Sequence, residues 1–194
     1  MINELLKKRC SVRNFSSRKV PTEIIDYILE AGRLSPSGGN EQPWKFGVIK
    51  DKSLIKIISK ICYNQKWIES SSFLIVLCAT IVDEELGGLF IQHSRCPELT
   101  EAISNLPKDL YSKINLEEHQ TKIPGSHMVL AALENAIYST WISYFNVEEL
   151  KTLLNLPVNC YPSEILAFGY PDGDVKKSTK KSLNEIVFYD TYSL

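Results

Sequence analysis

Two short stretches near the start of the chain decide how it should fold and what it should bind. They are Arg9-Cys10-Ser11-Val12-Arg13-Asn14-Phe15 and Ser35-Pro36-Ser37-Gly38-Gly39-Asn40-Glu41-Gln42-Pro43-Trp44. An arginine presents a planar, bidentate fork to a phosphate, and a side-chain amide both donates and accepts hydrogen bonds. A glycine pair lets the backbone approach a ligand closely. Together the stretches carry the groups that grip a phosphorylated, planar, hydrogen-bonding ligand.

The order and spacing of these residues resemble the FMN-dependent nitroreductase family. The matching pattern is Arg9-x-Ser11-x-Arg13-x-Phe15, followed by Pro36-Ser37-x-x-Asn40-x-Gln42-Pro43-Trp44. Two tail segments also match: residues 164–171 resemble the family's strand ending in Gly-Tyr-Pro, and residues 180–187 resemble its basic C-terminal ending. The resemblance covers nearly the whole chain and is patchy between about Asp83 and Pro124.

The resemblance implies a bound FMN and a set of residues that hold it. Arg9, Ser11 and a basic residue near the C-terminus would bind the phosphate, with Lys180 as first candidate and Lys181 as second. Arg13 would lie near the pyrimidine edge or the ribityl chain, and the Tyr144 amide would reach flavin N5. The expected cofactor-binding residues are Arg9, Cys10, Ser11, Arg13, Pro36, Ser37, Gly38, Asn40, Gln42, Tyr144, Lys180 and Lys181.

The same resemblance implies a reaction and an assembly. NAD(P)H would pass a hydride to the flavin and leave, and a nitroaromatic, quinone or similar acceptor would then take its place. Such a ping-pong cycle leaves the redox chemistry to the cofactor, so we expect no catalytic side chain. The family also implies an intertwined homodimer, in which the C-terminal strand joins the partner's sheet and each flavin lies between subunits.

Composition sets wider bounds. The 194 residues are 44% hydrophobic and 23% charged with a net charge of −1, which is typical of one globular domain spanning 1–194 and does not favour nucleic acid or a membrane surface as partner. The N-terminal residues lack a long apolar run, so we expect no signal peptide, and no stretch reaches the ~18 consecutive apolar residues of a membrane helix. Five cysteines without a CxxC pair indicate reduced thiols in the cytoplasm, and three scattered histidines indicate no metal site.

Hydrophobic periodicity predicts an α+β fold, a three-layer α/β/α sandwich around a mixed sheet. Residues 36–43 read as a loop, and residues 83–124, a guessed helical cover over the site, are the least readable part. The expected helices are a short first one with Leu5 and Leu6, then 21–32, 53–61, a long one from 128 through 141, and 147–154. The expected strands are 44–49, 73–79, 164–170 and 186–189.

Departures from the family pattern leave alternatives open. The family's Gly-Leu-Gly-Thr-Cys-Trp is here Ala136-Ile137-Tyr138-Ser139-Thr140-Trp141, and Ser143 and Tyr144 stand where small residues are common. A second hypothesis is therefore a flavin-binding storage or sensing module that does not turn over nicotinamide. A third is a domain without flavin, in which Arg9 and Arg13 lie on a solvated face and 37–40 is an ordinary turn.

Overall fold

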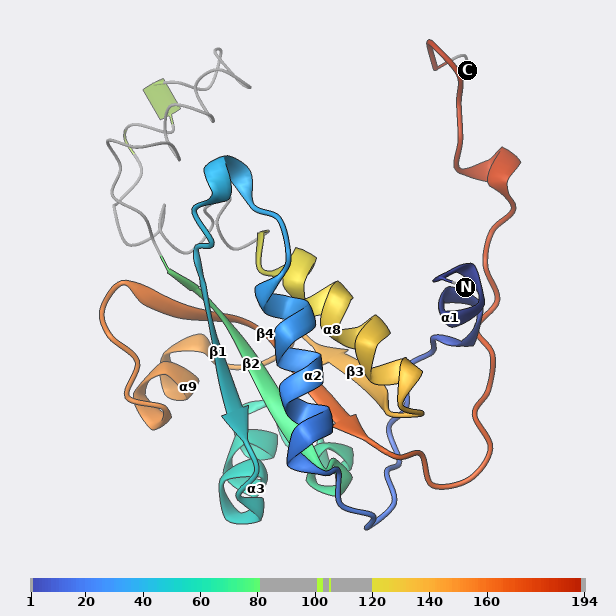
Figure 1. The fold of residues 1–194 in the computed structure, drawn as a ribbon. Coiled ribbons are helices and arrows are strands. Elements are labelled where there is room, and N and C mark those ends of the chain that lie inside the picture. Colours follow the sequence, from blue (N-terminus) through green and yellow to red (C-terminus); the bar gives the residue numbers. More distant parts are fainter. Residues whose placement is uncertain (1, 81–100, 103–104, 106–119, 193–194) are drawn as a thin grey trace.

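A four-stranded antiparallel sheet forms the centre of the molecule (Figure 1). The computed structural model describes residues 2–80, 101–102, 105 and 120–192. The strands are β1 (Trp44–Ile49), β2 (Phe73–Thr80), β3 (Tyr138–Ile142) and β4 (Cys160–Gly169), in the spatial order β1-β2-β4-β3. All three strand pairs are antiparallel, and the parallel pairing found in the described residues is the bridge between Ser11 and Ser139. The mixed character expected of the sheet is therefore confined to that bridge.

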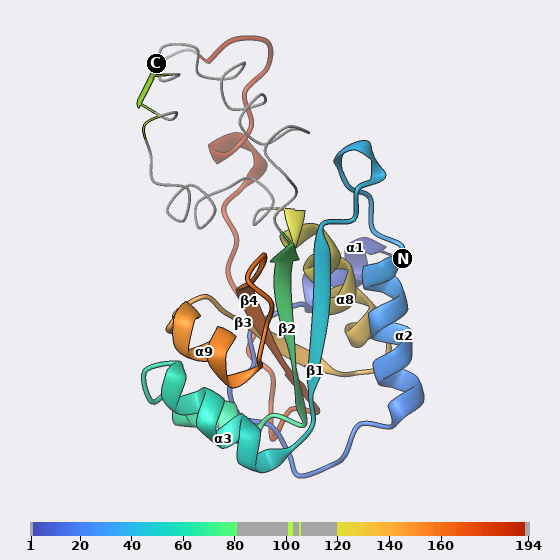
Figure 2. The same ribbon diagram turned by 90° about the vertical axis from the view of Figure 1, so that its left-hand side faces the viewer.

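The sheet is covered on both faces by helices, as Figure 2 shows with the sheet seen nearly edge-on. Helices α2 (Thr22–Arg33) and α8 (Lys122–Glu134) cover one face. Helices α3 (Lys52–Ile61) and α9 (Val147–Leu153), with the 3-10 turn η2 (Lys66–Ser70), cover the other. The predicted three-layer α+β architecture is confirmed.

Strand β2 shows why the core has two halves. Alternate side chains of a strand point to opposite faces. Phe73, Ile75 and Leu77 pack with α2 and α8, whereas Leu74, Val76 and Cys78 pack with α3 and α9. Every one of these side chains is buried, so the strand reads as a continuous apolar run rather than an alternating one.

Local sequence signals explain where the covering helices begin. The Asp51 carboxylate accepts from Leu54 N at 2.9 Å and caps α3. The Asn146 amide oxygen accepts from Glu148 N and Glu149 N and caps α9. Gly32 lets α2 approach α8, because a Cβ at this position would lie 2.0 Å from the Met128 Cε atom. The first helix, α1, spans Ile2–Lys8 as the sequence indicated.

The long helix expected from Met128 through Trp141 is wrong in its second half. Helix α8 ends at Glu134, and the chain turns through Ala136, whose φ of 56° lies in the left-handed region. Strand β3 follows. Helix α8 is apolar on most of its circumference, so the hydrophobic pattern did not show where it stops. The aromatic and β-branched residues after Ala136 favour a strand, and pairing with β4 fixes it.

The C-terminal segment also differs from the expectation in this single chain. Residues 186–189 form no strand with any part of the chain that the structure describes, and a short 3-10 turn, η5 (Leu183–Glu185), precedes them. Most of the segment predicted as helical cover, residues 81–119, lies outside the described residues apart from 101–102 and 105. No helix within the described ranges is long and apolar enough to cross a membrane.

Candidate functional site

The first motif is fastened to the edge of the sheet beside β3. Val12 N donates to Ser139 O at 3.3 Å, and Thr140 Oγ1 donates to Val12 O at 2.6 Å. Further along, Phe15 pairs with Pro171 and packs against Gly169, where a Cβ would lie 2.8 Å from the Phe15 ring. These contacts hold the segment in an extended conformation.

Extended geometry sends alternate side chains of the first motif to opposite sides. Cys10 is buried, with 5% of its surface exposed, while Ser11 and Arg13 are exposed. Burial raises the pKa of the Cys10 thiol, and the nearby Arg9 guanidinium opposes that rise only in part. Cys10 therefore stays protonated at neutral pH and fits the role of a passive neighbour rather than a redox thiol.

Arg13 and the bend at residues 143–144 meet on one surface through η2. The Arg13 guanidinium carbon lies 5.8 Å from the centre of the Trp67 ring, and Trp67 Nε1 donates to Gln65 Oε1 at 3.3 Å. Gln65 Nε2 in turn donates to Tyr144 O at 3.2 Å. Two predicted site residues that are distant in sequence are thus joined by residues of a short turn.

The backbone N–H of Tyr144 is an available hydrogen-bond donor. It donates to no acceptor within the part of the chain that the structure describes. Tyr144 as a residue is 66% exposed, and its ring stacks on that of Tyr63 with ring centroids 4.2 Å apart. An unpaired amide donor on the same surface as Arg13 fits a flat, anionic heterocycle that accepts hydrogen bonds.

The second motif forms a loop that is held by hydrogen bonds between its own residues. Gln42 N donates to Ser37 Oγ at 2.8 Å, and Gln42 Nε2 donates to Asn40 O at 3.1 Å. Gly39, Asn40 and Gln42 all have φ between 52° and 57°, so the loop holds two non-glycine residues in the left-handed region. Asn40 and Gln42 are exposed, and the loop contains the short turn η1 (Gly38–Asn40).

The structure does not bring the two motifs together within one chain. Figure 1 places η1 beyond the start of β1, whereas residues 9–15 lie on the opposite side of α2 and α8. No hydrogen bond or ion pair among the described residues joins residues 36–42 to residues 9–13. The loop instead contacts the start of α8, where Gly38 N donates to Gln120 Oε1 at 3.0 Å.

Comparison with known proteins identifies the fold and the motifs as those of one family. A model of the nitroreductase family matches residues 6–102, which are 97 of the 194 residues. The chain belongs to the nitroreductase family. The family resemblance read from the two motifs is thereby confirmed.

Individual relatives of this nitroreductase family member carry two kinds of name. A putative NADH dehydrogenase/NAD(P)H nitroreductase of Archaeoglobus fulgidus is 29% identical over 172 residues, covering 87% of this chain and 84% of that protein. An iodotyrosine deiodinase of Thermotoga neapolitana is 27% identical over 198 residues, covering 99% of both chains. The solved structure of a nitroreductase family protein from Clostridium difficile 630 is 28% identical, covers 99% of both chains and superposes with a TM-score of 0.74.

The two basic residues predicted near the C-terminus lie on an exposed arm. Lys180 and Lys181 are exposed, and no described contact links either to Arg9. The arm extends away from the sheet in both views (Figures 1 and 2). It also presents large apolar side chains to solvent: Leu183, Ile186, Val187, Phe188, Tyr189 and Tyr192.

Sequence reasoning missed the contribution of η2 to this nitroreductase site. Gln65 and Trp67 connect Arg13 to Tyr144, yet neither belongs to the motifs that identified the family. The available signal was a polar and aromatic cluster shortly after α3, Asn64-Gln65-Lys66-Trp67, in which two amides precede a tryptophan. Such a cluster is typical of a surface that contacts a ligand ring.

A separate cleft lies away from these residues. It has a volume of about 850 Å³ and opens between residues 15–22, residues 50–52 and the start of β2. None of the twelve predicted cofactor residues lines it. We therefore place the candidate site on the surface that contains Arg13 and Tyr144 rather than in the cleft.

Proposed function

We propose that this member of the nitroreductase family is a cytoplasmic FMN-dependent NAD(P)H oxidoreductase with a ping-pong cycle. The observation that carries the proposal is the surface that joins exposed Arg13 to Tyr144 through Gln65 and Trp67, with a Tyr144 amide that has no acceptor among the described residues. Both ends of that surface were predicted from the sequence as flavin contacts. Relatives named NAD(P)H nitroreductase support the same class of reaction.

The chain's residues divide the work of holding the cofactor. Arg9 and Ser11, at the start of the first motif, would bind the phosphate, and Arg13 would lie near the pyrimidine edge. A cation at that edge favours negative charge developing on the ring system. The Tyr144 N–H would donate to the ring, and the bond from Gln65 to the carbonyl of the same residue anchors this part of the backbone. FMN, once bound, would supply the hydride acceptor and donor for both half-reactions.

We further propose that the active form is a homodimer and that two chains complete each site. Within the described residues, strand β1 is an edge strand of the sheet and pairs with a neighbouring strand on one side only. The C-terminal arm carries six large exposed apolar side chains, and an exposed apolar surface of this kind marks an interaction site. An arm that joins the partner's sheet would bury them. The arm would also bring Lys180 or Lys181 to a flavin site of the partner. Dimer formation would likewise bring the Asn40 loop of one chain to a site that the other chain leaves incomplete.

The electron acceptor is proposed at the level of a chemical class. Relatives that are named for a nitroreductase and relatives that are named for an iodotyrosine deiodinase both align along most of this chain. One name states reduction of a nitro group by NAD(P)H, and the other states an aromatic substrate, iodotyrosine. We propose an aromatic acceptor for this protein as well, with nitroaromatics, quinones and iodotyrosine as the compounds to screen.

A visible spectrum tests the cofactor directly. The purified protein is incubated with FMN, free ligand is removed, and paired flavin bands at about one FMN per chain are expected. Anaerobic NADH or NADPH should then bleach the bands rapidly, and an acceptor should restore them. A colourless protein would contradict the proposal, whereas bound flavin that neither nucleotide bleaches would support the storage or sensing module instead.

A further inference from the structure

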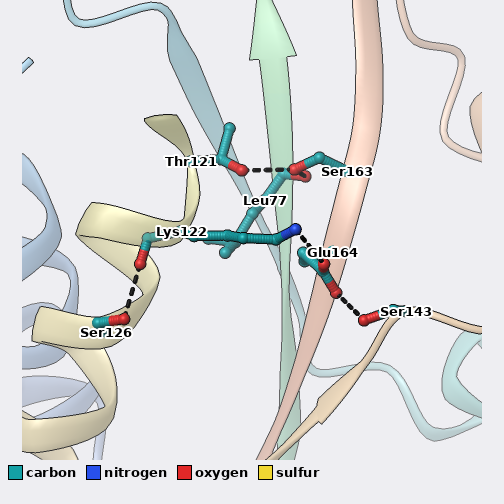
Figure 3. A network of polar contacts seen from close by, with 7 residues as sticks. All are labelled: Leu77, Thr121, Lys122, Ser126, Ser143, Ser163 and Glu164. Atoms are coloured by element: carbon teal, nitrogen blue, oxygen red, sulfur yellow. Dashed lines mark hydrogen bonds and ion pairs between the residues drawn. The ribbon is translucent and has the colours of Figure 1, made fainter. Parts of the chain in front are cut away.

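A buried charged network lies directly behind the bend that carries Tyr144 (Figure 3). The Glu164 side chain is only 5% exposed. One carboxylate oxygen accepts from Ser143 Oγ at 2.5 Å, and the other lies 3.3 Å from Lys122 Nζ. Ser143 is the residue that precedes Tyr144, so the network ends one residue from the proposed flavin contact.

Strand alternation places Glu164 on the α8 face of the sheet, together with Leu166 and Phe168, and a β-bulge lies next to it. Leu77 of β2 pairs with Glu164, and the next residue, Cys78, pairs with Pro162, so Ser163 is the extra residue. The Ser163 hydroxyl fills the gap by donating to Leu77 O at 3.1 Å, and it lies 2.6 Å from Thr121 Oγ1. Both Ser163 and Thr121 are buried, so the bulge is a fixed part of the core.

Burial of this charged network costs desolvation free energy, so stability alone does not account for it. A buried carboxylate needs compensation, and a buried ion pair is often no more stabilising than apolar residues of similar size. Here Lys122 supplies the compensating charge from the first turn of α8, although 44% of its side chain remains exposed. Ser143 supplies the remaining hydrogen bond. A charged group retained in such a place can fix a particular conformation.

We propose that Glu164 is a positioning residue that fixes the bend at residues 143–144 so that the Tyr144 N–H stays directed toward the flavin. The proposal rests on the proposed function. On one side, Ser143 bonds to Glu164 and holds the bend. On the other side, Gln65 donates a hydrogen bond to Tyr144, and Tyr63 stacks on the Tyr144 ring. In this chain these anchors take over from the small residues that are common at the two positions in the family.

The test compares two serine variants on the same network. Ser143→Ala removes the bond between the bend and Glu164 while the pair with Lys122 remains. Ser126→Ala is the matched control, because Ser126 Oγ donates only to Lys122 O, at 2.8 Å, within α8. In the apo-protein, we expect amide hydrogen exchange at residues 143–145 to accelerate in Ser143→Ala and to stay at the wild-type rate in Ser126→Ala.

Flavin binding supplies the second readout. Ser143→Ala should weaken the binding of FMN and of riboflavin by the same factor, because the disturbed contact is to the ring, which both flavins share. We expect a factor of about tenfold, which corresponds to the loss of one hydrogen bond. A purely structural role would instead lower the melting temperature without an equal loss for the two flavins. Ser143→Ala that behaves as Ser126→Ala in both readouts would overturn the proposal.

Substitutions of Glu164 separate its hydrogen bond from its charge. Glu164→Gln keeps an acceptor for Ser143, so exchange at the bend should stay within about twofold of wild type, whereas Glu164→Leu should match or exceed Ser143→Ala. Equal exchange in the Gln and Leu variants would overturn the positioning role. If wild-type protein binds no flavin, the proposed function fails, and the exchange experiment still decides whether Glu164 fixes the bend.

Discussion

The two motifs that reveal the family are held in very different ways. Residues 9–15 are bonded to β3 at Ser139 and Thr140, so their side chains are positioned by the sheet of their own chain. The loop at residues 36–42 is held mainly by its own side chains and has one hydrogen bond to the start of α8. The difference teaches that the sheet of its own chain prepares one half of the proposed site, whereas the other half depends mainly on hydrogen bonds within its own loop.

Removing both arginines of the sheet-bound motif should have the largest effect. Arg9→Ala combined with Arg13→Ala should weaken FMN at least about 100-fold, because each charge-assisted hydrogen bond contributes roughly 1.5–3 kcal/mol. Fluorescence titration of the apo-protein measures it. Arg33→Ala serves as control, since Arg33 pairs with Glu30 on the exposed side of α2. Unchanged FMN affinity in the double variant would refute the assignment of the first motif.

Changes in the self-organised loop should have a smaller effect. Asn40→Ala or Gln42→Ala should each weaken FMN about tenfold, because each removes one hydrogen-bonding side chain from a partly solvated contact. The same titration applies. Glu41→Ala, in the same loop and also exposed, should leave the affinity within about twofold.

Complementation decides whether the loop serves a second chain. Co-expression of the double-arginine variant with a loop variant that no longer binds FMN should restore about one quarter of the sites, because half of the random dimers carry one intact combination. Two motifs acting on the same flavin from the same chain would restore none. The bound flavin per chain, measured by absorbance, distinguishes these outcomes.

Loosening the first motif from the sheet should have an intermediate cost to stability. Thr140→Val deletes the bond to Val12 O at a buried site and leaves that carbonyl without its partner. The free energy of unfolding should fall by about 1–3 kcal/mol. Urea denaturation measures it, with exposed Thr152→Val on α9 as control. A change equal to that of the control would show that the sheet does not hold the motif.

The turn that leads into β3 offers a smaller change of opposite sign. Ala136 has a φ of 56°, so Ala136→Gly should relieve strain and stabilise the fold by about 0.5–1 kcal/mol. Ala131→Gly, inside α8, should instead destabilise by about 1 kcal/mol. Urea denaturation of both variants checks the pair, and a loss of stability in Ala136→Gly would contradict the prediction.

Thiol labelling should show the weakest signal. Burial raises the pKa of Cys10 above its ordinary value and raises the pKa of Cys62 and of Cys78 to about 12, so these groups are thiols at pH 8. In a Cys96→Ser background, labelling by a disulfide reagent should be slow when native and complete in urea. The rate should rise with pH as the thiolate fraction grows. Rapid native labelling at Cys10 would show that the first motif opens.

How far the sequence carried the interpretation differs between the two halves of the site. The buried run at 73–79 and the amphipathic helices predicted the core, because burial leaves either a continuous apolar run or a periodic pattern in the sequence. The family motifs named Arg13 and Tyr144, but not the residues that join them. Gln65 and Trp67 lie in a short turn without periodicity, and their partners are distant in sequence, so only the folded chain shows the connection.

Two further features were out of reach for similar reasons. The switch from helix to strand at Ala136 depends on pairing with β4, which local pattern does not record. The role of Glu164 depends on its partners, Lys122 of α8 and Ser143 after β3, which are distant from it in sequence. Read as a regular strand, residues 164–170 show a charged residue at one end and give no reason for it.

The exposed apolar arm at the C-terminus also bears on when the protein becomes active. The arm follows all four strands of the sheet in the chain, and under the proposed dimer its contacts belong to another molecule. Cofactor loading would therefore follow release and encounter rather than accompany synthesis. At low expression, activity in the cell would rise more steeply than the amount of protein, because each working site requires two finished chains.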